Sequence, residues 1–358
     1  MNATLDPSAY TDPVNARAEI DNIFQSLWIG IGRADQVMNP GDFVTREIAG
    51  HSLILTRDKD GVTHAFANVC RHRGSRLLEG EGNCRLIKCP FHAWAYGPDG
   101  RLVAAPHMDE CADFEQSSHG LIEYPVAERL GFLFIALGDA PDIDDQLADF
   151  ASVHAPWPLG ALKTLRRRKF DVACNWKSFL DVFNEYYHLS SVHPGSIDSL
   201  YARPEAGDDV SGDFATQFGR TEGTGGLLES RQDQALPHMP GLGSQWRGGV
   251  RYTWVFPTMT FAAGRDALWV YEAFPDGPDR CRVVQSVCFH PETMETPGFN
   301  ERSAAYIERA DAAIEEDIPV LEFQHRGLQS RNAVAGPLHP LLEKSVARFA
   351  RWYEARMS

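Results

Sequence analysis

Two short cysteine–histidine pairs are the residues of this chain that most clearly predict chemistry. Cys70-Arg71-His72 is followed, after sixteen residues, by Cys89-Pro90-Phe91-His92. Two thiolates and two imidazoles can bind zinc tetrahedrally. They can also hold a [2Fe–2S] cluster, with the cysteines on one iron and the histidines on the other. The spacing favours the cluster, because each pair lies in its own tight loop and can give one ligand to each iron. A structural zinc site is the alternative.

A second group of candidate metal-binding side chains lies in residues 175–194. Four polar residues repeat at i, i+3, i+4 and i+7 of a predicted helix and share one face: Asp181, Asn184, Glu185 and His188. The remaining faces are mostly apolar, so the polar face is predicted to be buried, where carboxylates and imidazoles need partners or a metal. His193 stands about 140° around a regular helix from His188. Both rings reach one metal only if the helix loosens between them, which Pro194 permits.

Taken together, the two groups resemble the oxygenase (alpha) subunit of Rieske non-haem iron ring-hydroxylating oxygenases, over nearly the whole chain. The resemblance implies four ligands of a Rieske [2Fe–2S] cluster: Cys70, His72, Cys89 and His92. It also implies that His188 and His193 bind a mononuclear iron(II). The family completes this iron site with a carboxylate from a late helix, which gives the 2-His-1-carboxylate facial triad of oxygen-activating iron enzymes.

The matching late segment is Glu315 to Gln324. We select Asp317 as the third iron ligand and keep Glu316 as the alternative. Pro319 is expected to kink this helix, since it removes a backbone donor and crowds the carbonyl of Glu315. A kink beside a ligand would help to aim it at the metal.

Glu185 matches the family's acidic residue that links an iron-binding histidine to a cluster histidine of the neighbouring subunit, and it is our candidate catalytic residue. Many members carry Asp at this position, and Glu is more frequent in members that act on N-methylated or quaternary ammonium substrates. Asp181 also departs from the family's common Asn. It either makes the surroundings of the iron more acidic or is a structural residue.

Composition excludes several classes of partner. The chain has 358 residues and a net charge of −15, which argues against nucleic acid or an anionic membrane as partner. The most apolar run, Leu130 to Leu137, is far shorter than the roughly 20 residues that a membrane helix needs. The N-terminus has no signal-peptide pattern, so a cytoplasmic location is expected.

Periodicity predicts an α+β chain in three parts. An N-terminal helical segment over residues 1–37, with a helix from Asp12-Pro13 to Trp28, is expected to pack on the catalytic domain. Residues 38–145 form an antiparallel all-β domain, and residues 146–358 form the catalytic domain. By resemblance these are the Rieske domain and a helix-grip (Bet v 1-like) domain. Residues 203–249 are rich in Gly, Ser, Asp and Pro, which predicts a loop-dominated lid.

The implied function is that of a terminal oxygenase, which activates O2 at iron(II) with electrons from the Rieske cluster and hydroxylates a small aromatic substrate. No nucleotide-binding glycine motif follows a predicted strand. A separate reductase, with or without a ferredoxin, is therefore expected to bring electrons from NAD(P)H. The family is built on trimers, which implies a homotrimer.

Three alternatives stay open at this stage. The reaction is dihydroxylation or monohydroxylation of an aromatic ring, or it is a monooxygenase or demethylase reaction on an N-methylated or quaternary ammonium compound. From another class, the chain would be a Rieske electron carrier or redox sensor without oxygenase activity. Six aromatic residues of a predicted strand meander either line a substrate pocket or form core: Tyr252, Trp254, Phe256, Phe261, Trp269 and Tyr271.

Overall fold

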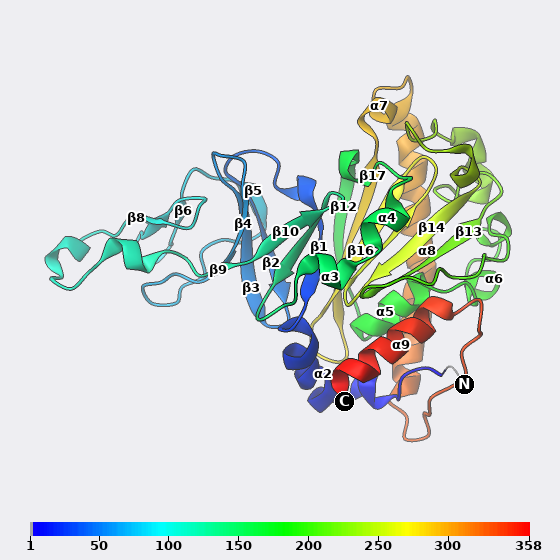
Figure 1. Ribbon diagram of the computed structural model, residues 1–358, viewed down its shortest axis with the longest axis horizontal. Coiled ribbons are helices and arrows are strands. Elements are labelled where there is room, and N and C mark those ends of the chain that lie inside the picture. Colours follow the sequence, from blue (N-terminus) through cyan, green and yellow to red (C-terminus); the bar gives the residue numbers. More distant parts are fainter. Residues whose placement is uncertain (1–2) are drawn as a thin grey trace.

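The protein is a body built around one large sheet, with a narrow arm of small sheets extending from it (Figure 1). The computed structural model describes residues 3–358. The helices are α1 (Ser8–Thr11), α2 (Pro13–Glu19), α3 (Ile143–Leu147), α4 (Phe150–His154), α5 (Trp176–Phe183), α6 (Leu189–Val192), α7 (Pro291–Met294), α8 (Phe299–Leu328) and α9 (Lys344–Met357).

The strands form four antiparallel sheets. The arm contains β2 (Asp42–Ile48), β3 (His51–Arg57), β4 (Thr63–Ala67), β5 (Glu81–Asn83), β6 (Ile87–Lys88), β7 (Ala95–Tyr96), β8 (Leu102–Ala104) and β9 (Glu123–Tyr124). A connecting sheet contains β1 (Trp28–Arg33), β10 (Val126–Arg129) and β11 (Phe132–Ala136). The body sheet contains β12 (Lys163–Val172), β13 (Phe214–Arg220), β14 (Gly249–Val255), β15 (Met259–Ala263), β16 (Leu268–Pro275) and β17 (Cys281–Phe289).

The start of the chain is helical only as far as Phe24. Asp12 caps α2 as expected, because its side chain accepts a hydrogen bond from the backbone N–H of Val14. A π-helical turn, Ile20–Phe24, follows α2. The prediction of helix through Trp28 is wrong, since Trp28 opens β1, which pairs with β11. The apolar residues there alternate along a buried strand, a pattern that a short window does not separate from helical spacing.

The arm carries two sheets, with strand orders β5-β2-β3-β4-β9 and β6-β7-β8. Asp58-Lys59-Asp60-Gly61 connects β3 to β4, and Gly97 to Gly100 connect β7 to β8. The small core of the arm includes Phe66, Trp94 and Tyr96. In the view of Figure 1 the arm extends to the left, with β6 and β8 near its outer end.

The body sheet has the order β12-β17-β16-β15-β14-β13. Alternate residues of β16 face opposite sides: Trp269 and Tyr271 join one core, and Leu268 and Val270 join the other. Residues 203–249 are mostly loop, as expected, but Phe214–Arg220 form a strand. These residues pair in register with Gly249–Val255 as the edge strand β13.

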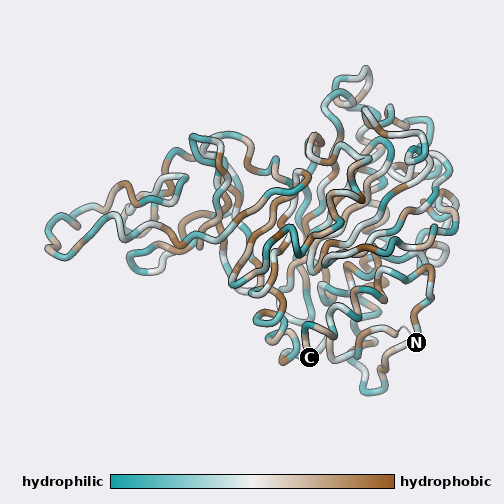
Figure 2. The backbone as a smooth tube through the Cα atoms, viewed as in Figure 1, coloured by the Kyte–Doolittle hydropathy of each residue, from teal (hydrophilic) through white to brown (hydrophobic). Residues whose placement is uncertain are grey.

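Each face of the body sheet has its own cover. The connecting sheet packs on one face, where Phe132 of β11 stacks on Phe261 of β15 with ring centroids 4.9 Å apart. Helices α5, α8 and α9 cover the other face and contribute Phe179, Ile314 and Phe349 to its core. Hydrophobic residues are frequent along the strands of the body, while hydrophilic residues are frequent in the loops at its rim (Figure 2).

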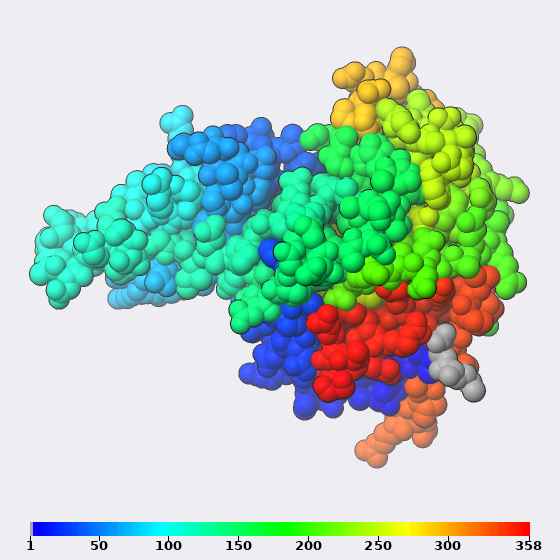
Figure 3. Space-filling view, viewed as in Figure 1, coloured from blue at the N-terminus to red at the C-terminus, as the bar shows by residue number. Residues whose placement is uncertain are grey.

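A buried ionic cluster fixes the N-terminal helices to this layer. Glu19 accepts hydrogen bonds from Lys177 Nζ at 2.5 Å, Tyr353 Oη at 2.7 Å and Trp176 Nε1 at 3.0 Å. The N-terminal residues and α9 accordingly lie side by side in the space-filling view (Figure 3). Because α5 leads directly into the candidate iron site, this cluster also fixes the position of that helix. Within residues 3–358, no helix is long and apolar enough to cross a membrane.

Candidate active site

The two loops that carry the cysteine–histidine pairs have the same backbone design. Cys70 N–H donates to Ser75 O at 2.8 Å, and Gly74 N–H donates back to Cys70 O at 3.0 Å. In the second loop, Cys89 N–H donates to Trp94 O at 2.7 Å and Ala93 N–H donates to Cys89 O at 3.1 Å. The fifth residue of each loop has positive φ, 72° at Gly74 and 60° at Ala93. Such turns close tightly and bring both histidine rings to the same side of the loops.

The histidines of the two loops face each other at the surface of the arm. Both cysteines are buried, while His72 is exposed. The Nδ1 atoms of His72 and His92 lie 3.1 Å apart, so each ring turns this nitrogen toward the other. Tyr96 Oη lies 3.3 Å from Cys70 Sγ. Two buried thiols and two facing imidazole nitrogens are a donor set that suits a Rieske cluster.

The segment after α5 departs from the continuous helix that the sequence predicted. Helix α5 ends at Phe183, and residues 184–188 are not helical before the short α6. Asn184 folds back to donate to Leu180 O at 2.7 Å. The carboxylate of Glu185 accepts the backbone N–H groups of Tyr187 and His188, as a helix-capping residue does. The polar residues therefore do not share one helix face, and the break lies before His188 rather than between the two histidines.

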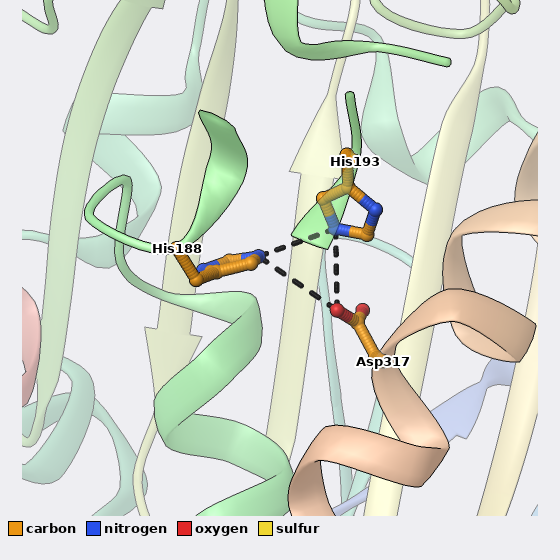
Figure 4. Close-up of side chains that lie close together, drawn as sticks. All are labelled: His188, His193 and Asp317. Atoms are coloured by element: carbon orange, nitrogen blue, oxygen red, sulfur yellow. Dashed lines mark hydrogen bonds and ion pairs between the residues drawn. The ribbon is translucent and has the colours of Figure 1, made fainter. Parts of the chain in front are cut away.

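His188, His193 and Asp317 meet at one point (Figure 4). His188 precedes α6, His193 follows α6, and Asp317 comes from α8. The Nε2 atoms of the histidines lie 3.2 Å apart. Asp317 Oδ1 lies 3.2 Å from His193 Nε2 and 3.8 Å from His188 Nε2. Helix α8 runs unbroken through Pro319, and the expected kink there stays a prediction.

Two further carboxylates hold the outer edges of the histidine rings. His188 Nδ1 lies 2.5 Å from Glu185 Oε1, and His193 Nδ1 lies 2.6 Å from Glu316 Oε2. A carboxylate can only accept, so each Nδ1 carries the proton and each Nε2 presents its lone pair. Glu316, our alternative ligand, thus lies on the side of His193 away from the meeting point. Asp317 is the carboxylate that faces both Nε2 atoms.

The arrangement around the three ligand atoms suits a cation. Two Nε2 lone pairs and an anionic oxygen converge there, and Asp317 Oδ1 is buried with no hydrogen-bond partner. Burial lowers the pKa of His193, but the carboxylates of Asp317 and Glu316 outweigh it and hold that pKa above the usual value. Two histidines and one carboxylate with an open side are the donor set of non-haem iron(II) oxygenases.

A small cavity opens beside the triad, and His188, His193 and Asp317 form part of its wall. Aromatic side chains make much of its wall: Phe183, Tyr186, Tyr201, Tyr252 and Tyr271. Two of the six aromatic residues that the sequence left open, Tyr252 and Tyr271, thus line the cavity. Trp254, Phe256 and Phe261 are core.

Asp181 lies away from the three ligand atoms. It is buried and accepts a hydrogen bond from Tyr10 Oη at 2.9 Å. Burial raises its pKa to about 7. This contact between α5 and the N-terminal helices corresponds to the structural alternative for Asp181.

Sequence reasoning did not single out Arg309, which lines the same cavity two turns of α8 before Asp317. The signal was present, because the buried positions of α8 are otherwise mostly apolar: Ala305, Tyr306, Ala310, Ala313, Ile314 and Leu321 among them. An arginine within such a stripe is either paired or functional.

Comparisons with known proteins identify the domain that carries each of the two sites. Residues 159–358 match the family described as ring hydroxylating alpha subunit (catalytic domain), and residues 27–121 match the Rieske [2Fe-2S] domain. The chain is 29% identical to the carnitine monooxygenase oxygenase subunit of Escherichia coli K12, over 92% of this chain and 85% of the relative. It is 28% identical to the glycine betaine monooxygenase oxygenase subunit of Chromohalobacter salexigens, over 97% and 84%. A crystal structure of the quaternary ammonium Rieske monooxygenase CntA with L-carnitine superposes with a TM-score of 0.83, at 25% identity, covering 99% of this chain and 96% of the other.

Proposed function

This chain belongs to the ring-hydroxylating alpha-subunit family and is the terminal oxygenase subunit of a Rieske oxygenase, and from this premise we propose that it oxygenates an N-methylated or quaternary ammonium compound. The observation that carries the proposal is the meeting of His188, His193 and Asp317 at the wall of an aromatic cavity. The catalytic domain at residues 159–358 also sets aside the alternative of a simple electron carrier, which would need only the Rieske domain.

The proposed ligands divide between the two ends of the molecule. Cys70, His72, Cys89 and His92 would hold the [2Fe–2S] cluster. His188, His193 and Asp317 would hold iron(II), which supplies O2 activation when it is bound. Around that site the protein orients the two imidazole rings through Glu185 and Glu316, which hold the Nδ1 atoms so that the Nε2 atoms face the iron site.

Three observations favour an N-methyl substrate over an aromatic ring. The relatives named above act on carnitine and glycine betaine. The cavity wall presents tyrosine faces, which attract a positively charged trimethylammonium group. The acidic residue beside His188 is Glu, as the resemblance led us to expect for such substrates. Hydroxylation of a small aromatic compound, by one or two oxygen atoms, is the second candidate, because the same aromatic faces can stack on a planar ring.

The electron path is proposed to run between subunits. The cluster loops lie in the arm while the triad lies among α5, α6 and α8 in the body (Figure 1). A homotrimer that places the arm of one chain against Glu185 of the next would shorten this path, and the relative CntA is described as using inter-subunit electron transfer. A separate reductase, with or without a ferredoxin, would deliver electrons from NAD(P)H. A cytoplasmic location stays a prediction.

A single-turnover experiment tests the function without the unknown reductase. The holoprotein is reduced with dithionite, freed of excess reductant, and mixed with O2 and either L-carnitine, glycine betaine, choline or benzoate. We expect oxidation of the reduced cluster and formation of an oxygenated or demethylated product with at least one N-methylated probe. Asp317→Ala, which removes a proposed iron ligand but leaves the arm untouched, is the control and should form no product. Product from benzoate alone would favour the aromatic candidate.

A further inference from the structure

Arg309 is a buried cation without a counter-ion. Its side chain lines the cavity beside the triad and is only 4% exposed. It forms no ion pair with any carboxylate of residues 3–358, and its Nε has no hydrogen-bond partner. The contacts that it makes are a hydrogen bond from Nη2 to Tyr201 Oη at 3.4 Å and a stacking contact on Trp269 at 4.8 Å.

Other buried cations of residues 3–358 have a carboxylate or a backbone carbonyl as partner, although the Nε atoms of Arg33, Arg46 and Arg251 also lack a hydrogen-bond partner. Lys177 bonds Glu19 at 2.5 Å, and Arg251 pairs with Asp208. Arg33 donates to the carbonyls of Leu159 and Leu162. Burial of a charge is costly unless it is paired and hydrogen-bonded. Trp269 and Tyr201 hold the Arg309 side chain in place, but no anion binds its guanidinium N–H groups. An arginine in this state can bind an anionic group of a ligand.

We propose that Arg309 binds a carboxylate of the substrate, so that the substrate is an N-methylated amino acid of the betaine type rather than a simple cation. The inference rests on the proposed function only for the N-methyl end of the substrate. Tyr201 takes part because its hydroxyl accepts from Arg309 and lies 2.7 Å from Tyr252 Oη.

The position of Arg309 gives such a substrate a direction. Eight residues of α8 separate Arg309 from Asp317, which is about 12 Å along the helix axis. A carboxylate held at Arg309 places the opposite, methylated end of a short zwitterion toward the triad, along the faces of Tyr252 and Tyr271. A cation without a carboxylate would instead meet the unpaired guanidinium and be repelled.

Matched ligands test the proposal by calorimetry on the holoprotein kept free of O2. Glycine betaine is compared with choline, which has a hydroxymethyl group in place of the carboxylate, and L-carnitine with its methyl ester. Benzoate is compared with benzyl alcohol. We expect at least one carboxylate to bind tenfold or more tightly than its partner. Arg309→Met should weaken the binding of that carboxylate by about 30-fold or more, since truncation of one partner of a buried charge pair has effects of this size on affinity. Arg309→Lys should recover part of the loss.

Two controls separate binding from folding. Arg231→Met removes a half-exposed arginine that pairs with Glu308 on α8, and it should leave every affinity unchanged. Arg309→Met should not lower the Tm of the ligand-free protein, because no ion pair is lost, and glycine betaine should raise the Tm of the parent but not of this variant. A large drop in Tm without ligand would mean that Arg309 is structural and would overturn the proposal.

The remaining outcomes are also decisive. Equal affinity for carboxylates and their partners, including no binding by any probe, would overturn the inference. Efficient turnover of choline with Arg309→Met unimpaired would keep the N-methyl monooxygenase function and overturn the carboxylate site. Binding of benzoate that depends on Arg309, without any reaction of an N-methyl group, would keep the carboxylate site and overturn the proposed function.

Discussion

The cluster loops and the triad use opposite nitrogens of their histidines. In the arm, His72 and His92 turn Nδ1 toward each other. In the body, His188 and His193 turn Nε2 toward each other and bind a carboxylate through Nδ1. Within residues 3–358, neither His72 nor His92 is paired with a carboxylate, whereas His64 of the arm is paired with Asp58. The outer N–H groups of the arm are thus available at the surface for another protein, while the body closes its site with its own acids. This difference suits electron entry at the arm and oxygen chemistry in the body.

The largest effect is expected when one metal site is removed and the other is kept. Asp317→Ala should lower iron from about three to about two per chain and abolish turnover, while the EPR signal of the reduced cluster persists. Cys89→Ser should do the reverse, with loss of the cluster signal. Iron analysis, acid-labile sulfide and EPR check both variants. If Asp317→Ala retains full iron and activity, the ligand is to be sought at Glu316.

The two carboxylates that bind histidine Nδ1 atoms offer a matched pair of variants. Glu185→Gln should slow the oxidation of the reduced cluster by about 100-fold if this residue also reaches an arm histidine of the next subunit, while iron content and assembly persist. Glu316→Gln makes the same change on His193 and should weaken iron binding by about 10–100-fold, yet leave electron transfer intact when iron is saturating. Stopped-flow absorbance under single turnover measures the rate. Equal rates in both variants would mean that Glu185 only orients His188.

A smaller effect is expected from Tyr96 in the arm. Its hydroxyl lies 3.3 Å from Cys70 Sγ, and hydrogen bonds to ligand sulfur stabilise the reduced cluster. One such bond contributes about 1 kcal/mol, which for one electron is about 40 mV. Tyr96→Phe should therefore lower the reduction potential by about 40 mV in protein-film voltammetry. Tyr124→Phe, which removes a hydroxyl near His51 in the same arm, should leave the potential unchanged.

The smallest effect on turnover is expected from Glu272 of β16, where the arm and body meet the connecting sheet. Burial raises the pKa of Glu272 to about 7, although Arg46, Arg167 and Arg33 oppose the rise. Both carboxylate oxygens lack hydrogen-bond partners. Because the folded pKa exceeds the unfolded value, ionisation destabilises the fold, starting near pH 4.5 and reaching its full extent above about pH 7.

Glu272→Gln should therefore raise the free energy of unfolding by roughly 3 kcal/mol at pH 8, with a smaller gain at pH 5. Urea titrations at both pH values measure this difference, and turnover should not change. A gain that does not vary with pH would show that the carboxyl is already ionised or already paired across the whole range.

Those features of the fold and the candidate sites that depend on residues close together in the sequence could be predicted from it. Each cysteine–histidine pair lies within one turn, so the spacing in the sequence already predicts that the cysteine and the histidine of a pair lie close together. His188 and His193 are also near neighbours in the sequence. The α+β class follows from periodicity alone. The strands at residues 28–33 and 214–220 were not predicted from the sequence. These short segments are strands because they pair with β11 and β14, which are distant in the chain.

Which side chains face the iron site was decided only by the tertiary structure. Glu316 and Asp317 are adjacent on α8, about 100° apart, and the sequence gives no measure of how that helix is rotated against α6. Packing places Asp317 at the Nε2 atoms and Glu316 at the far edge of His193. The lack of an acidic partner for Arg309 within residues 3–358 likewise depends on which distant segments pack around it, among them the one that carries Tyr201. Such relations are long-range and depend on the rotation of packed helices, which periodicity does not encode.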